Sequence, residues 1–216
     1  MSNDTLLLGR RGLLGLAIPA VVATMSWRTA HADVESGASA PIQRLDSALL
    51  AAMKAGQSTP FPQRYTALAP VIDQTFDLDA VLGASIGLGW PGMPSDQKAQ
   101  LVAAFRRYTV ASYAANFDNY TGQTFQIAPS VRSVGNGDVV VATKIVAADG
   151  SSNKLDYVMR NTASGWKAVD VLADGSISRV AVQRSDFRHL LNSGGAPALM
   201  AGLQRKVVSL SGGVLA

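Results

Sequence analysis

The chain has 216 residues, 48% of them hydrophobic and 16% charged, with a formal net charge of +4 and no cysteine. The lack of cysteine excludes disulfides, a thiolate nucleophile and a thiolate metal site, and two histidines are too few for a multi-histidine metal cluster. The small net charge, without runs of lysine or arginine, argues against nucleic acid as the main partner, so the sequence predicts no metal, no cofactor and no nucleic-acid ligand.

The first 32 residues are typical of a cleaved export signal. Arg10 and Arg11 precede an apolar run from Gly12 to Met25, and a small-x-small triplet follows at residues 30–32. The run is too short for a membrane anchor, which needs about 20 apolar residues. We therefore expect cleavage after Ala32, which removes three arginines and one aspartate and lowers the net charge from +4 to +2. The adjacent arginines leave twin-arginine export open beside the general route.

The next part of the chain predicts a leader and three helices. Residues 33–40 are small and polar, which indicates a flexible leader. A first helix is expected from Pro41, a second from about Pro62, and a third from Asp77, whose carboxylate suits the N-cap position. Apolar residues at helical spacing support the first and third of these helices, at Ile42, Leu45, Leu49 and Met53 and at Val81, Leu82 and Ile86. The sequence GLGWPGMP at residues 87–94 then predicts a turn-rich loop that contains Trp90.

The longest helical pattern begins after this loop. Ser95 is expected as its N-cap, and the pattern continues to about Phe117. One stripe of this helix is apolar or small, with Leu101, Phe105, Tyr108 and Ser112, and it is broadened by Val102, Tyr113 and Phe117. A helix with such a stripe should bury it against the rest of the domain.

After Gly122 the pattern changes to a period of two, which predicts strands. They are expected at residues 124–127, 131–134, 139–146, 154–161 and 166–172, separated by short turns rich in glycine, asparagine and aspartate. This is the pattern of an antiparallel meander. Helical spacing returns with Ser185 as the expected N-cap and Gly194 as the stop, and a final helix is expected from Pro197 to Lys206. Helices, then strands, then helices predict an α+β domain with one sheet face covered by helices.

Several segments resemble one protein family. They are QKAQLVAAFRRYTVASYAANF at residues 97–117, YTGQTFQIAP at 120–129, GWKAVDVLADG at 165–175 and SISRVAVQRSDFRHLL at 176–191. In this order they resemble the MlaC family, also called the toluene-tolerance auxiliary proteins, over about Pro41 to Lys206. Within that family TVASYAANF, DYVMR (residues 156–160) and QRSDFR (residues 183–188) resemble the hopanoid-associated branch, HpnM.

The resemblance implies a fold and a function. The fold would be a single MlaC-like (NTF2-like) domain at residues 41–210, in which N- and C-terminal helices pack on a curved antiparallel sheet and enclose an apolar cavity. The function would be that of a periplasmic carrier of phospholipid, or of hopanoid in the HpnM branch, between the inner and outer membranes. Its partner would be the MCE-type subunit of an inner-membrane ABC transporter, with an outer-membrane lipoprotein complex as a further partner.

The expected cavity walls come from three parts of the chain. The long helix contributes an aromatic stripe, the helix before it an aliphatic face, and two strands a row of valines: Phe105, Tyr108, Tyr113 and Phe117; Val81, Leu82 and Ile86; and Val158, Val169 and Val171. Trp90, in a glycine-rich loop, is a candidate for a mobile cover over the cavity mouth.

An enzyme is the alternative. Small NTF2-like isomerases or dehydratases need only an aspartate and a tyrosine as acid and base, and Asp156, Tyr157 and Asp170 are the candidates. Strand alternation argues against Asp170, because it is expected to point away from the face of Val169 and Val171, although the sequence leaves open which face is covered. A purely structural or regulatory interaction module is a third possibility. The sequence favours a carrier with no catalytic site.

Overall fold

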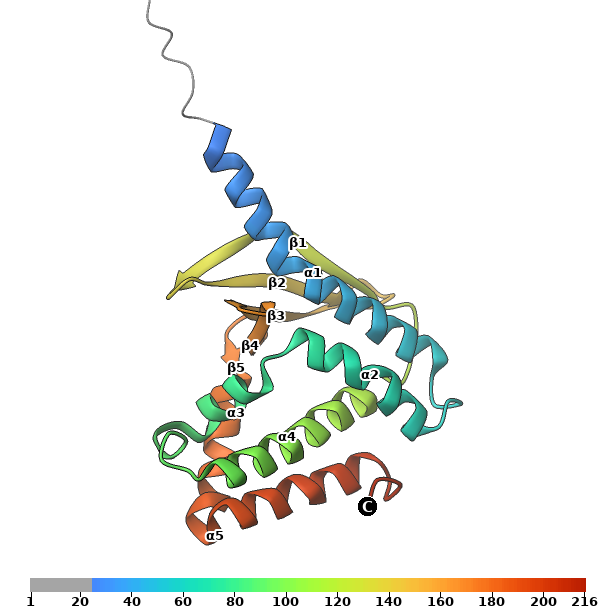
Figure 1. Cartoon of the computed structure of the whole chain (residues 1–216). Coiled ribbons are helices and arrows are strands. Elements are labelled where there is room, and N and C mark those ends of the chain that lie inside the picture. The colour runs from blue at the N-terminus through green and yellow to red at the C-terminus, as the bar shows by residue number, and fades with distance from the viewer. Residues whose placement is uncertain (1–24) are drawn as a thin grey trace, which may run out of the picture.

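Four α-helices precede the sheet and one long, kinked helix follows it (Figure 1). The computed structural model describes the backbone of residues 25–216 and the side chains from Gly37 onward, so most of the predicted export signal lies outside the described residues. The helices are α1 (Met25–Ala55), α2 (Phe61–Thr75), α3 (Leu78–Ile86), the short 3₁₀ helix η1 (Gly87–Gly89), α4 (Ser95–Asn116) and α5 (Arg179–Leu210). The strands are β1 (Thr124–Gly135), β2 (Asp138–Val146), β3 (Ser152–Thr162), β4 (Gly165–Ala173) and β5 (Ile177–Ser178).

Helix α1 begins before the expected start at Pro41. Ala38 and Ser39 are buried, and a β-carbon added to Gly37 would lie 3.0 Å from Nε1 of Trp166 on β4. Residues 37–40 are therefore part of a helix packed on the sheet rather than part of a flexible leader. Pro41 lies inside the helix.

The helix starts agree with the expected caps in one of three cases. Asp77 caps α3 as predicted, because its carboxylate accepts a hydrogen bond from the backbone N–H of Ala80 at 3.0 Å. The prediction of Ser95 as an N-cap is wrong by one position, since α4 begins at Ser95 and Pro94 precedes it without a side-chain cap. Ser185 is also wrong as a cap. Helix α5 begins six residues earlier, where the Ser178 hydroxyl accepts from the N–H of Ala181.

Helix α5 is interrupted where the sequence predicts a stop. Gly194 and Gly195 have non-helical backbone angles, and Gly195 has a φ of 63°, which a residue with a side chain rarely adopts. The kink divides α5 into two halves. The second half runs beside α4 in Figure 1, and the two helices pack against each other.

The sheet is an antiparallel meander in the order β1-β2-β3-β4-β5. The two strands expected at 124–127 and 131–134 form one strand, β1, which pairs with β2 on both sides of an irregularity between Ile127 and Val131. Pro129 lies in this irregularity, where its missing N–H disrupts the ladder without ending it. The following two-residue turn has positive φ at both Asn136 and Gly137, as a tight hairpin requires.

A bulge in β4 decides which strand residues face the helices. Met159 pairs with Ala168 and Val158 pairs with Asp170, so that Val169 is an extra residue on β4. Tyr157 and Met159, which flank Val158 along β3 and so point to the opposite face, belong to the hydrophobic core. Val158 therefore faces away from the helices, contrary to the prediction. Val169, the extra residue at the bulge, is only 8% exposed but is not part of the same cluster.

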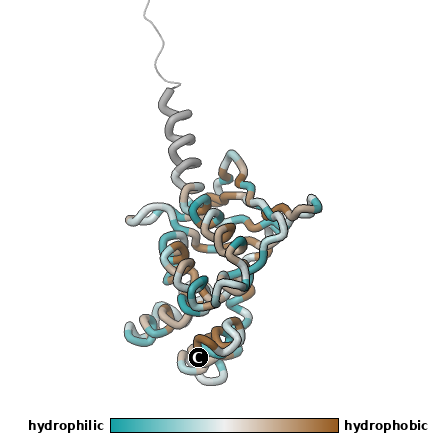
Figure 2. The backbone as a smooth tube through the Cα atoms, turned by 90° about the vertical axis from the view of Figure 1, so that its right-hand side faces the viewer, coloured by the Kyte–Doolittle hydropathy of each residue, from teal (hydrophilic) through white to brown (hydrophobic). Residues whose placement is uncertain are grey.

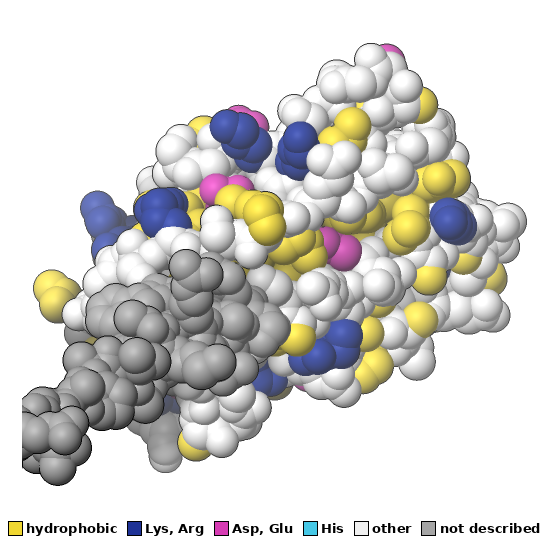
Figure 3. Space-filling model, turned by 90° about the horizontal axis from the view of Figure 1, so that it is seen from above, with side chains coloured by type: hydrophobic (Ala, Val, Ile, Leu, Met, Phe, Trp, Pro, Cys, Tyr) yellow, Lys and Arg dark blue, Asp and Glu magenta, His cyan; other side chains and the backbone are white. Residues whose placement is uncertain are grey.

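All five α-helices contribute to one continuous hydrophobic core with the helix-facing side of β2, β3 and β4. In Figure 2 the helices alternate between hydrophobic and hydrophilic stretches, as expected for helices buried on one side only. Figure 3 shows that hydrophobic side chains also gather in the middle of the face seen from above, among scattered charged ones. Within residues 25–216 no helix is both long enough and apolar enough to cross a bilayer.

Candidate functional site

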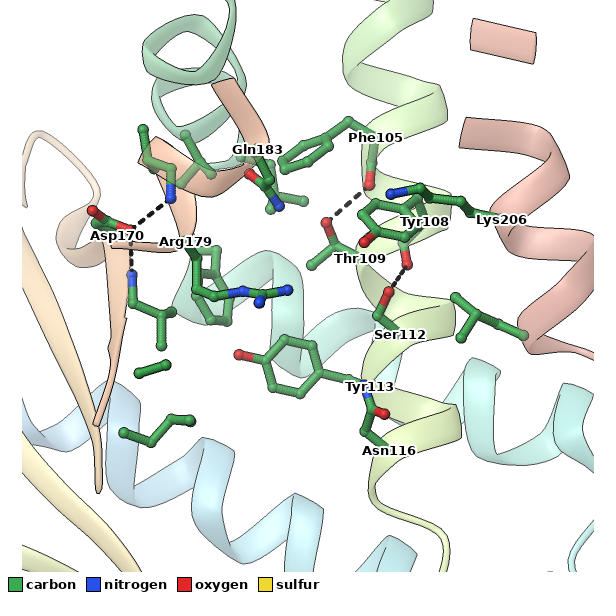
Figure 4. Close-up of a pocket in the computed structure, with 18 of the residues that line it drawn as sticks. Phe105, Tyr108, Thr109, Ser112, Tyr113, Asn116, Asp170, Arg179, Gln183 and Lys206 are labelled. Atoms are coloured by element: carbon green, nitrogen blue, oxygen red, sulfur yellow. Dashed lines mark hydrogen bonds between the residues drawn. The ribbon is translucent and has the colours of Figure 1, made fainter. Parts of the chain in front are cut away.

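A cavity of about 580 Å³ lies between the sheet and the helices. Its walls come from β3, β4, α3, α4 and both halves of α5, and Figure 4 shows part of its lining. Aromatic and aliphatic side chains form most of the surface: Phe76, Phe105, Tyr108, Tyr113, Phe117, Leu78, Val81, Leu155, Val171, Val180 and Leu210. Cavities of this size and character bind small apolar ligands.

An array of aromatic rings runs along one side of the cavity. Tyr113 and Phe117, one helical turn apart on α4, are stacked with ring centroids 5.7 Å apart and planes at 11°. Phe76 lies 5.7 Å from Tyr113, and Phe125 lies 6.2 Å from Phe117. The stripe predicted on α4 therefore lines the cavity as two aromatic pairs, Phe105 with Tyr108 and Tyr113 with Phe117, because residues three and four apart share one helix face.

Polar side chains also line the cavity, and most come from α4 and α5. On α4 the hydroxyls of Thr109 and Ser112 donate to the backbone carbonyls of Phe105 and Tyr108, each at 2.9 Å, so that their hydrogen-bonding capacity is partly used within the helix. The remaining polar groups on the walls are Asn116, Asp170, Arg179, Gln183, Lys206 and Ser209.

Two of these groups are cations. Arg179, the first residue of α5, extends its guanidinium group toward the middle of the cavity, on the side where the Tyr113 hydroxyl also points (Figure 4). Lys206, from the second half of α5, lies 5.5 Å from the centroid of the Tyr108 ring and 3.6 Å from the Asp186 carboxylate. Both cations are exposed to solvent, which places them toward the open part of the cavity.

A buried polar cluster lies behind the aromatic wall. Asp46 of α1 is only 7% exposed, one of its carboxylate oxygens has no hydrogen-bond partner, and burial raises its pKa to about 7. Burial also raises the pKa of Tyr113 and of Tyr157 well above the usual range, and the nearby Asp46 adds to both shifts. Tyr113 is on the cavity wall, whereas Asp46 and Tyr157 are not.

The structure brings together part of the predicted set. Six of the predicted wall residues line the cavity: Val81, Phe105, Tyr108, Tyr113, Phe117 and Val171. Five do not: Leu82, Ile86, Trp90, Val158 and Val169. Leu82 is fully buried in the core beside the cavity, and Ile86 packs against that core one helical turn further on.

Trp90 packs on helix α3. A β-carbon added to Gly83 would lie 2.6 Å from Nε1 of Trp90, so the indole ring fits only because residue 83 is glycine. The ammonium group of Lys98, on α4, lies 5.5 Å from the centre of the Trp90 ring. This position covers part of α3, and Trp90 does not line the cavity whose mouth it was expected to cover.

The polar wall residues Arg179, Gln183 and Lys206 and the buried Asp46 are absent from the predicted site. Arg179 and Gln183 were missed because the helix was expected to begin at Ser185, which left both in a loop. The burial of Asp46 could have been predicted from helical spacing. Asp46 follows Ile42 by four residues and precedes Leu49 by three, so it lies beside the buried stripe of α1.

The proposed acid and base of an enzyme are not brought together on the cavity wall, because Asp170 lines the cavity whereas Asp156 and Tyr157 do not. Asp156 alternates with Tyr157 along β3, and its carboxylate accepts from the backbone N–H of Thr143 at 3.1 Å. Asp170 accepts from the Ser178 hydroxyl and from the N–H of Val180 at 3.1 Å, so it ties β4 to the start of α5. Both carboxylates therefore have structural partners.

Comparison with known proteins agrees with this geometry. Residues 43–205 match the family described as MlaC protein. Among solved structures the chain is similar to a phospholipid-binding protein from Ralstonia solanacearum in complex with a phospholipid, with a TM-score of 0.68 and 21% identity over 81% of this chain and 98% of that chain. These two findings confirm the predicted α+β fold of helices packed on an antiparallel sheet.

Proposed function

The chain belongs to the MlaC family, and from this we propose that it is a periplasmic lipid carrier that holds the apolar part of one lipid molecule in the cavity between β3, β4, α4 and α5. The observation that carries the proposal is the cavity itself, which is about 580 Å³ in volume and lined mainly by aromatic and aliphatic side chains. The named function of the Ralstonia protein of similar fold, phospholipid binding, supports the same ligand class here.

The size of the cavity suits a lipid chain. At roughly 30 Å³ per water-sized group, a volume of about 580 Å³ holds about 20 methylene groups. Transfer of such a chain from water contributes on the order of 15 kcal/mol at about 0.8 kcal/mol per methylene. One long acyl chain therefore fits the space as it stands, and a second chain requires the walls to move apart.

The lipid class and the partner proteins are proposed from membership of the MlaC family. We propose a phospholipid as the ligand, with a hopanoid as the alternative if the chain belongs to the HpnM branch. The donor or acceptor would be the MCE-type subunit of an inner-membrane ABC transporter, and an outer-membrane lipoprotein complex would complete the route. A carrier needs no acid–base pair, which agrees with the structural roles of Asp156 and Asp170.

Export is part of this proposal, and it predicts the mature N-terminus. Because the signal formed by Arg10, Arg11 and the apolar run should be cut after Ala32, protein recovered from the periplasm should begin at Asp33. N-terminal sequencing or intact-mass measurement checks this. A periplasmic protein that retains Met1 would contradict the predicted cut.

Filling the cavity should remove the lipid. Val171 lines the cavity, so Val171→Trp should leave a folded protein whose lipid content after purification is several-fold lower than that of the wild type. The measurement is lipid extraction with mass spectrometry, beside a thermal melt that shows folding. Val158→Trp is the matched control. Val158 is also a half-buried strand valine, but it lies on the face of the sheet opposite to the cavity.

The two variants show whether the lipid lies in this cavity or at another place on the protein. Loss of lipid in Val171→Trp with retention in Val158→Trp supports the carrier. Equal lipid content in both folded variants would place the lipid elsewhere, and absence of lipid from the wild type purified from its own periplasm would contradict the proposed function.

A further inference from the structure

The walls of the cavity carry an excess of positive charge. Arg179 and Lys206 are the cations, and Asp170 is the one carboxylate among the lining residues of the described chain. The Asp170 carboxylate already accepts hydrogen bonds from Ser178, Val180 and its neighbour Val171. It is therefore held at the start of α5, and among the described residues it forms no ion pair with Arg179 or Lys206.

Arg179 faces the ligand space. Figure 4 shows its guanidinium group extended between the β4 side of the cavity and Tyr113 on α4. Its positive charge acts on the Tyr113 hydroxyl, where it opposes the rise in pKa that burial causes. Among the residues that the structure describes, Arg179 forms no ion pair with a carboxylate.

Lys206 supports the same charge pattern from the opposite half of α5. Its ion pair with Asp186 joins two groups that are 46% and 53% exposed, at 3.6 Å. Such an exposed pair contributes little stability and exchanges readily with another anion. A lipid whose apolar chain fills the cavity would have its polar end in the exposed part. Both cations lie in that exposed part.

We propose that Arg179, assisted by Lys206, binds the anionic group of the lipid, a carboxylate or a phosphate, so that the cavity selects anionic lipids over neutral ones. The proposal rests on the proposed lipid binding and adds the chemistry of the ligand's polar end. A guanidinium group donates two parallel hydrogen bonds to a carboxylate or phosphate, which a neutral hydroxyl cannot accept with the same strength. The nearby amide of Gln183 offers further polar contact.

The test compares lipids that share their apolar part. Delipidated mature protein is offered dioleoyl phosphatidylglycerol together with dioleoylglycerol, and in a second arm oleate together with oleyl alcohol, each pair at equal concentration from cyclodextrin. The bound lipids are extracted after gel filtration and quantified by mass spectrometry. The first arm reports recognition of a phosphate and the second recognition of a carboxylate.

The wild type should bind the anionic lipid in about tenfold excess over its neutral partner in at least one arm. Arg179→Gln should reduce the ratio to near one while total lipid stays within about twofold, and Arg179→Lys should keep an intermediate ratio. Arg188→Gln is the control, because Arg188 is an exposed arginine of the same half of α5 that does not line the cavity. It should keep the wild-type ratio.

The outcomes separate this inference from the proposed function. A wild type that binds lipid without preference in both arms, or an Arg179→Gln variant that keeps the preference, overturns the assignment of Arg179 and leaves lipid binding in place. A wild type that binds none of the four lipids contradicts the proposed function itself. A change of ratio in Arg188→Gln equal to that in Arg179→Gln would show a general charge effect and also overturn the assignment.

Discussion

Asp46→Asn should make the protein more stable above pH 7, by up to about 4 kcal/mol in the free energy of unfolding. Burial raises the pKa of Asp46 from 3.8 to about 7 in the folded protein, whereas the unfolded chain keeps an ordinary aspartate. Between these two values the folded state holds a proton that the unfolded state has released. The stability contributed by the neutral carboxyl group is therefore complete below about pH 4 and is lost as the pH rises through 7.

Asparagine has the same shape as the neutral carboxyl group and cannot ionise. Urea unfolding at several pH values should show the wild type losing stability from about pH 4 to about pH 7 and Asp46→Asn remaining nearly level, with similar stability for both near pH 4. Asp79→Asn removes an exposed carboxylate from α3 and is the control. This variant should lose stability with rising pH in the same way as the wild type. Parallel profiles for the wild type and Asp46→Asn would contradict the assignment of this titration to Asp46.

Phe187→Ala should be the most destabilising single truncation of an aromatic residue near the cavity. Phe187 is 2% exposed, lies in the first half of α5, and meets the Phe105 ring edge-on at 6.2 Å and 87°. It does not line this cavity, so its removal takes away buried core contacts and leaves the direct contacts to a ligand there in place. We expect a loss of about 3 to 5 kcal/mol in the free energy of unfolding, which lowers the melting temperature by about 10 °C.

Phe117→Ala is the comparison. Phe117 is half-buried and faces the cavity, where its ring stacks on Tyr113. Because the Phe117 side chain already borders the ligand space, Phe117→Ala should lower the free energy of unfolding by less than half as much as Phe187→Ala. Bound lipid should restore part of this free energy. Chemical denaturation of both variants with and without lipid measures the difference. Equal losses in the two variants, unaffected by lipid, would indicate that residue 117 belongs to a solid core.

Helix periodicity predicted the parts of the site that local spacing determines. The aromatic stripe of α4 lines the cavity as expected, because residues such as Phe105 and Tyr113 follow the helical repeat with no irregularity between them. The Asp77 cap and the kink near Gly194 were predictable for the same reason, since each depends on a residue type at one position.

The direction in which some strand residues point could not be predicted from the sequence. Val169 and Val171 should share a face by alternation, but the bulge opposite Val158 inserts a residue and breaks that rule, and nothing in the order of apolar residues marks it. The start of α5 was missed for a different reason. Its cap is completed by Asp170, eight residues earlier on another element, so the signal exists only after β4 and α5 have come together.

The irregularity at Pro129 affects whether the edge of the sheet can pair with another molecule of the same protein. Strand β1 is the edge of the sheet and is 12 residues long, a length that would otherwise offer a template for another chain to extend the sheet. Pro129 removes one backbone donor in its middle, the bulge bends the strand there, and Arg132 adds an exposed charge nearby. The edge is thereby protected against intermolecular pairing, and this protein can keep a long curved sheet without becoming prone to aggregate along it.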